Sequence, residues 1–294
     1  MATLFGIIAL LFWSSLALLA AKTGSLPPFL ILALCFSVSF IISVVWRYKH
    51  YGRWFSRPKL RRSQWLLGIY GLFGYHFCYF FALRFAPVLE ANLINYLWPL
   101  LLTLFLAHKG ERVFALLGGV IAFSGIAVLL STEQASFSSQ HIVGYILALG
   151  AAFIWSSYSA LLTKQKSDLG DIGWISLAVA ALSMSCHFLF EPRVTSISLI
   201  EWGYILLIGL GPLGGSFYLW EHGLAKGNNR LLASLSFFTP VFSSMLLALF
   251  GLAHWSVEMF VALVMILLGG LVTHSKNAWQ KMLLKADTKK NQAN

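Results

Sequence analysis

Apolar residues fill long runs along this chain, and short polar segments separate the runs. Ten of the runs are long enough for a membrane-spanning helix, which needs about 20 residues. They cover residues 3–21, 28–46, 64–83, 89–107, 113–130, 142–162, 172–190, 203–221, 231–250 and 257–274. The short alternating segments that build a membrane β-barrel are absent. The pattern therefore predicts an all-α integral membrane protein with ten transmembrane helices.

Composition and charge support this prediction and add an orientation. Of the 294 residues, 59% are hydrophobic and 11% are charged, whereas a soluble domain carries about 25% charged residues. Segment 47–63 holds seven Lys or Arg and no acidic residue. If the N-terminus is cytoplasmic, 18 of the 21 Lys and Arg lie inside. Because cytoplasmic loops are rich in Lys and Arg, both termini are predicted to be cytoplasmic.

The net charge of +11 mostly reflects this topology. Basic loops next to a bilayer attract anionic headgroups, so membrane lipid is a predicted partner. No globular fold carries the charge, and no nucleic-acid partner is therefore expected.

The chain contains an internal duplication. Residues 9–22 match residues 151–164 at six of fourteen positions, including Trp-Ser-Ser. Residues 66–83 and 207–224 share Leu and Gly positions at an offset of 141, and the same offset places Pro99 on Pro240.

Each half of the duplication holds five predicted helices, so the second half enters the membrane from the opposite side. Such inverted repeats are common in secondary transporters, with the substrate site between the halves. The predicted units are a first repeat over 1–135, a second repeat over 136–276, and a basic cytoplasmic tail over 277–294.

With ten spans, two repeats and a proline in each fourth helix, the chain resembles the EamA-type transporters of the drug/metabolite transporter superfamily. Its segment KGERVFALLGGVIAFSGIAVLL (109–130) is similar to the family's acidic loop and Gly-rich fifth helix. The motifs NYLWP (95–99), FWSS and IWSSY resemble the aromatic amino-acid exporter subgroup.

The resemblance implies a multi-pass transporter of the cytoplasmic (inner) membrane that exports aromatic amino acids and related amphipathic metabolites by alternating access. The alternative is an exporter of hydrophobic cationic drugs or of other amino acids. One chain supplies both halves, so a monomer suffices and a dimer is also compatible.

The polar residues of segment 89–107 share one helix face. Asn92, Asn95, Tyr96 and Pro99 follow the spacing i, i+3, i+4, i+7. An unpaired asparagine facing lipid costs several kcal/mol, so this face is expected to point into protein or water. Pro99 removes a helical hydrogen bond and predicts a bend, as Pro240 does in the second half. For Asn95, a role in helix packing is the alternative.

Aromatic and histidine side chains at mid-span complete the predicted site. His76 and Tyr79 lie past the middle of their span, where the interfacial aromatic belt explains them poorly. The tryptophans Trp13 and Trp155 precede the duplicated Ser-Ser pairs, and their rings suit stacking on a planar solute. His76 is interpreted as a hydrogen-bond donor to the substrate, with a packing histidine as the alternative. The predicted substrate-binding residues are Trp13, His76, Tyr79, Asn95, Tyr96, Trp98 and Trp155.

Glu221 and His222 close the predicted span 203–221 and are candidates for proton coupling, since carboxylates and histidines form proton relays in membranes. The alternative is that they lie in a water-exposed turn at the helix end. The other histidines are scattered near loops, and no metal-binding or catalytic cluster is visible. We therefore expect no enzyme activity, no metal and no cofactor. No central span carries Lys or Arg, which disfavours a nucleotide-sugar or phosphate-ester antiporter.

Overall fold

The computed structural model describes residues 1–23, 26–130, 137–165, 169–273 and 275. The predicted basic tail, 277–294, lies outside the described residues. Within them the chain is helical and contains no strand. The elements are α1 (Ala2–Ala20), α2 (Pro28–Tyr51), α3 (Arg62–Gly68), the π-helix η1 (Ile69–Gly74), α4 (Tyr75–Phe85), α5 (Val88–Asn95), α6 (Trp98–Leu106), α7 (Arg112–Leu130), η2 (Ser139–His141), α8 (Ile142–Leu162), α9 (Leu169–Phe190), α10 (Leu199–Leu210), α11 (Gly215–Lys226), α12 (Asn229–Leu235), η3 (Ser236–Phe238), α13 (Thr239–Leu249) and an apolar helix over Val257–Thr273.

The helices have the length and surface of an integral membrane protein. Among the described residues, nine helices or consecutive helix series are long and apolar enough to cross a bilayer, and Val257–Thr273 is a shorter apolar helix. Large apolar side chains such as Leu66, Phe188 and Leu199 are exposed on the outside of the bundle. Water would not stabilise such a surface, but the hydrocarbon of a bilayer would.

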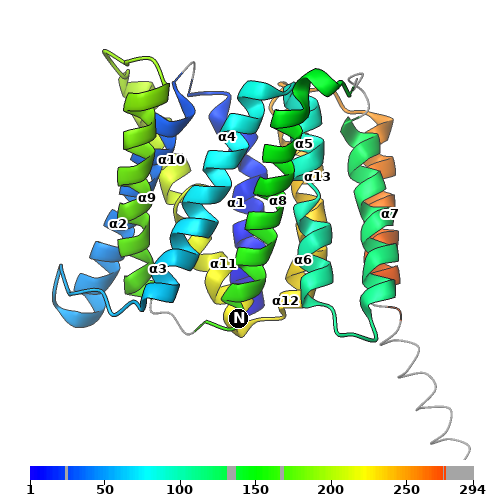
Figure 1. Ribbon diagram of the computed structural model, residues 1–294, viewed down its shortest axis with the longest axis horizontal. Coiled ribbons are helices and arrows are strands. Elements are labelled where there is room, and N and C mark those ends of the chain that lie inside the picture. Colours follow the sequence, from blue (N-terminus) through cyan, green and yellow to red (C-terminus); the bar gives the residue numbers. More distant parts are fainter. Residues whose placement is uncertain (24–25, 131–136, 166–168, 274, 276–294) are drawn as a thin grey trace, which may run out of the picture.

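The helices stand side by side, and the chain passes repeatedly from one end of the bundle to the other (Figure 1). The N-terminus and the basic loop between α2 and α3 lie at the same end, at the bottom of Figure 1. Below we call this the N-terminal end, and the opposite end the far end.

The two halves of the sequence interleave. Helix α1 packs against α11 and α13, whereas α8, the first long helix of the second half, packs against α4 and α6. Helices α2 and α9 pack against each other. Near α7 the backbones come close: a Cβ added at Gly118 would lie 2.3 Å from the Gly269 carbonyl oxygen. Because contacts run between the halves in both directions, the interior of the bundle is built from both.

Helix interruptions cluster in the middle of the bundle. The π-helix η1 separates α3 from α4, and Tyr96 and Leu97 separate α5 from α6. The 3-10 turn η3 separates α12 from α13. Pro99 and Pro240 are each the second residue of the helix that follows an interruption. Proline fits this position because its missing N–H is not needed in a first turn.

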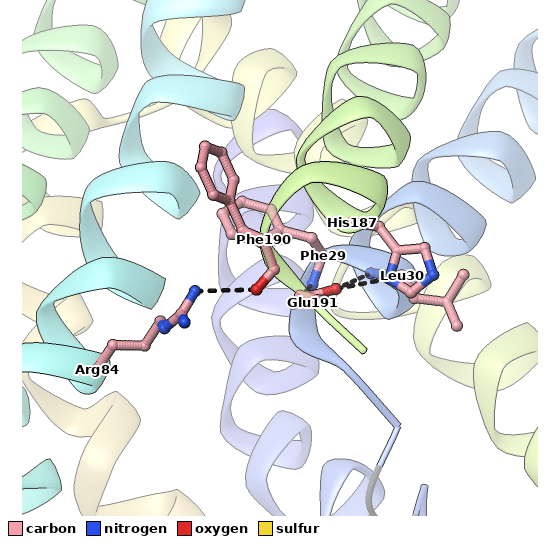
Figure 2. Close-up of polar contacts among 6 residues, drawn as sticks. All are labelled: Phe29, Leu30, Arg84, His187, Phe190 and Glu191. Atoms are coloured by element: carbon pink, nitrogen blue, oxygen red, sulfur yellow. Dashed lines mark hydrogen bonds and ion pairs between the residues drawn. The ribbon is translucent and has the colours of Figure 1, made fainter. Parts of the chain in front are cut away.

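A group of polar contacts fixes the start of α2 at the far end of the bundle (Figure 2). The Glu191 carboxylate accepts hydrogen bonds from the backbone N–H groups of Phe29 (2.8 Å) and Leu30 (3.2 Å). The Nδ1 atom of His187 lies 2.9 Å from the same carboxylate. Arg84 donates to the carbonyl of Phe190, 3.2 Å away. The first N–H groups of a helix have no partner within it, so Glu191 ties α2 to α9.

Candidate functional site

A cavity of about 490 Å³ lies between the two halves of the chain. Among the described residues, its lining contains aromatic, amide, hydroxyl and aliphatic side chains and no Lys, Arg, Asp or Glu. The lining residues are Trp13, Leu16, Ala17, Ala20, Thr23, Leu26, Pro28, Ile31, Tyr75, His76, Tyr79, Phe80, Asn92, Asn95, Tyr96, Trp98, Trp155, Ile208, Leu213, Phe217, Thr239 and Ser243. Its volume fits a small organic ligand.

The cavity occupies the half of the bundle nearer the far end. Along α1 the lining begins at Trp13 and continues through Ala20, while residues 1–12 do not contribute. Ala17, Ala20 and Pro28 are exposed as well as lining, so the cavity reaches the molecular surface on this side. The Glu191 contacts hold the start of α2, and thereby Pro28, at the rim.

Four tryptophans from four helices meet at the inner end of the cavity. The ring centroid of Trp13 lies 5.3 Å from that of Trp155, 5.1 Å from that of Trp220 and 6.5 Å from that of Trp98. The ring planes cross steeply, which is a favoured arrangement for aromatic pairs. The indole of Trp13 donates to the Pro212 carbonyl at 3.0 Å. This tryptophan cluster is therefore held in a fixed geometry.

The Trp220 indole donates to the Ser159 hydroxyl at 3.1 Å and is almost fully buried. It anchors the tryptophan cluster to α8, the first long helix of the second half.

Helices α4 and α5 supply most of the polar groups. His76 Nδ1 lies 2.6 Å from the Leu72 carbonyl, and the Tyr79 hydroxyl donates to Oδ1 of Asn92. The Asn95 amide nitrogen donates to the Tyr75 hydroxyl at 3.3 Å. The π-helix η1 directly precedes Tyr75, and its wider turn changes which face of α4 the following residues occupy.

All seven residues predicted to bind substrate line this one cavity. They come from three parts of the chain that are far apart in sequence: α1, the segment from α4 to α6, and α8. Three of these lining residues, Asn95, Tyr96 and Trp98, lie at the interruption between α5 and α6, directly before Pro99.

The two coupling candidates lie elsewhere. Glu221 does not line the large cavity; it is 7% exposed and lines a separate space of about 20 Å³ with Gln64 and Tyr158. His222 packs edge-on against Phe5, with ring centroids 5.3 Å apart. The predicted end of the span at Glu221 was wrong, and the alternative that Glu221 lies in a water-exposed turn does not agree with its burial. Helix α11 continues to Lys226, and the crossing formed by α10 and α11 spans 28 residues, Leu199–Lys226.

Among the residues that sequence reasoning missed are Phe217 and Thr239, which line the cavity from the second half, and Trp220, which belongs to the tryptophan cluster. A signal for them existed in the duplication. They lie 141 residues after His76, Tyr79 and Trp98 respectively, at the offset that aligns the prolines.

Comparisons with known proteins point to one class. The profile of the EamA-like transporter family matches residues 1–131 and again residues 142–274. A protein of Ancylobacter novellus named aromatic amino acid exporter YddG is 39% identical over 279 residues, which cover 92% of this chain and 96% of that protein. A protein of the same name from Salmonella typhimurium is 27% identical over 289 residues, with the same coverage of both chains.

A solved crystal structure has the same fold. It superposes with a TM-score of 0.85 at 37% sequence identity and covers 92% of this chain and 95% of its own.

Proposed function

The chain belongs to the EamA-like transporter family, and on this premise we propose that it exports aromatic amino acids and related amphipathic metabolites across the inner membrane. The relatives are exporters and not enzymes, and the helices are those of a multi-pass inner membrane protein. The relatives' names support the substrate class.

One observation supports this substrate class above the others: the cavity is walled by aromatic rings, and none of its described lining residues is Lys, Arg, Asp or Glu. Ring faces provide affinity for a planar solute, worth about 0.5–1.5 kcal/mol for each pair of rings. An anionic phosphate ester would require a cation there, and a cationic drug would gain from a carboxylate. A zwitterion has no net charge and fits neutral dipoles.

The mechanism proposed is alternating access between two inverted five-helix repeats, residues 1–135 and 136–276, within ten membrane spans. Two matches to the family profile and the reciprocal packing of α1 on α11 and α8 on α4 support it. If both termini are cytoplasmic, the cavity described here opens to the outside, with the tryptophan cluster on its cytoplasmic side. One chain forms the pathway, so a monomer is sufficient.

Counterflow in liposomes tests the proposal. Purified protein would be reconstituted with unlabelled phenylalanine inside, and uptake of labelled phenylalanine and tryptophan measured. Trp155→Ala removes a lining ring, and Phe153→Ala is the matched control because Phe153 lies on the same helix but is exposed on the outside of the bundle. We expect saturable exchange that Trp155→Ala lowers at least about tenfold and Phe153→Ala preserves.

Glutamate, a sugar phosphate and a hydrophobic cation serve as competing solutes in the same assay. Exchange of the cation in the absence of phenylalanine exchange would favour the drug-exporter alternative and overturn the proposed substrate. Equal losses in the two variants would show that the cavity is not the binding site.

A further inference from the structure

An amino acid that enters this cavity brings an ammonium and a carboxylate with it. Both groups lose hydration on binding and need hydrogen-bond partners inside the cavity. Because the lining residues that the structure describes carry no Lys, Arg, Asp or Glu, neutral dipoles must replace the lost water.

Most shielded polar atoms of the lining already have partners. The Trp13 indole, His76 Nδ1 and the Tyr79 hydroxyl are all engaged within the protein. Two shielded side-chain oxygens of lining residues have no partner among the described residues: Oδ1 of Asn95 and Oγ1 of Thr239. A buried polar atom without a partner costs about 1–3 kcal/mol, so such atoms in a cavity indicate a missing ligand.

Asn95 and Thr239 have different hydrogen-bond partners within the protein, and this decides whether each can accept from or donate to a ligand. Asn95 is 5% exposed, and its amide nitrogen donates to the Tyr75 hydroxyl. The amide is thereby oriented with its oxygen, a pure acceptor, left for another donor.

Thr239 is 8% exposed. The hydroxyls of Thr103, Thr163 and Thr273 donate to a carbonyl three or four residues earlier, as threonine usually does in helices. Thr239 starts α13 directly after the 3-10 turn η3, and its hydroxyl makes no such bond. Its O–H is therefore free to donate to a ligand.

We infer that Asn95 and Thr239 recognise the two ends of the amino-acid head group: Asn95 Oδ1 accepts from the ammonium, and the Thr239 hydroxyl donates to the carboxylate. The inference rests on the proposed function and adds how the substrate is oriented. The helix ends agree with it, because α5 ends at Asn95 and α13 begins at Thr239. A helix C-terminus favours a cation, and a helix N-terminus favours an anion.

Substrate analogues that lack one charged group test the two roles separately. Binding of labelled phenylalanine would be measured by scintillation proximity on the purified protein, with phenylalanine, phenethylamine (no carboxylate) and 3-phenylpropionate (no ammonium) as competitors. Thr239→Val removes only the hydroxyl, and Thr239→Ser keeps it. Thr103→Val is the matched control, since Thr103 is equally buried but does not line the cavity.

We expect Thr239→Val to weaken phenylalanine binding by about tenfold or more, because it removes a hydrogen bond to a charged group. The affinity for phenethylamine should change by less than about twofold, and Thr239→Ser and Thr103→Val should bind like the parent. Asn95→Leu should weaken phenylalanine and phenethylamine and spare 3-phenylpropionate. Asn95→Asp keeps the acceptor and adds a charge, so it should strengthen phenethylamine binding.

Thr239→Val losses that are equal for all three competitors would overturn the role of the hydroxyl, since they indicate altered packing. Unchanged phenylalanine binding in both Thr239→Val and Asn95→Leu would overturn the whole inference while leaving the proposed function intact. A parent protein that neither binds nor exchanges any aromatic amino acid would overturn both.

Discussion

The segments 95–99 and 236–240 occupy equivalent places in the duplicated sequence but contribute different chemistry. In each, a helix is interrupted just before a proline at the second position of the next helix. Asn95 lines the cavity, whereas its counterpart Ser236 is buried and donates to the Ala233 carbonyl. Trp98 presents a ring to the cavity, and its counterpart Thr239 presents a small polar side chain.

The comparison separates what the duplication preserved from what diverged. The interrupted backbone is common to both segments and suits a movement that the two halves exchange. The side chains differ between the two segments, which suits the proposed substrate, a solute with a ring at one end and charges at the other. A two-fold symmetric lining would bind such a solute poorly.

The largest effect is expected at the position where the two segments differ most. Trp98→Ala should lower phenylalanine exchange at least about tenfold, because it removes a ring that contacts three other tryptophans. Trp98→Phe, which keeps an aromatic ring, should retain most of the activity. The measurement is counterflow in liposomes with protein that elutes as a single peak from size exclusion. Full activity in Trp98→Ala would contradict a role of this ring in substrate binding.

Variants of Pro99 and Pro240 test the feature that the two segments share, which is the interrupted helix. Pro99→Ala and Pro240→Ala each restore a backbone N–H and allow a more continuous helix. We expect both to slow exchange by a similar factor, roughly two- to fivefold, with little change in phenylalanine affinity. Exchange rates and binding constants would be compared for each variant. A large effect at one proline alone would show that the two interruptions are not equivalent.

A second contact between the two halves lies at the far end of α2 and α9. At the far end, Glu191 of the second half accepts from the first N–H groups of α2. Glu191→Ala leaves these donors without that acceptor and should lower the free energy of unfolding by about 1–2 kcal/mol. Thermal unfolding in detergent measures it, and Glu191→Gln, which keeps one acceptor oxygen, should lose less. An unchanged melting temperature in Glu191→Ala would contradict a stabilising role.

The smallest effect is expected at an ion pair between the halves at the N-terminal end. Glu111 Oε2 lies 2.7 Å from the Arg230 guanidinium. Partial desolvation raises the pKa of the Glu111 carboxyl, but the charge and hydrogen bond of Arg230 outweigh it, so the pKa lies below its usual value. Such a pair stabilises the protein above the carboxyl's ordinary pKa and loses its effect as the pH falls through the lowered value.

Glu111→Gln should therefore destabilise the protein by less than about 1 kcal/mol at neutral pH, because Arg230 is 40% exposed and solvent screens the pair. The difference between variant and parent should vanish in acid and shrink at high salt. Thermal unfolding across pH and salt would show this. A difference that persists in acid would require another role for Glu111.

The sequence by itself determined the helical membrane class, the approximate position of the apolar runs, the duplication and the resemblance to a transporter family. It also identified seven residues that the structure gathers around one cavity. These seven residues could be picked out because polar and aromatic groups at mid-span are costly in hydrocarbon and stand out against an apolar background.

Only the tertiary structure decided which further side chains of the second half face the cavity and where Glu221 lies. The 141-residue offset points to Phe217, Trp220 and Thr239, but it does not show which way their side chains face, because in lipid an apolar side chain is tolerated on every face of a helix. Hydrophobic periodicity therefore does not reveal which face is internal. The π-helix before Tyr75 and the break between α10 and α11 change which way the residues that follow them face, and a regular helical period does not include such changes.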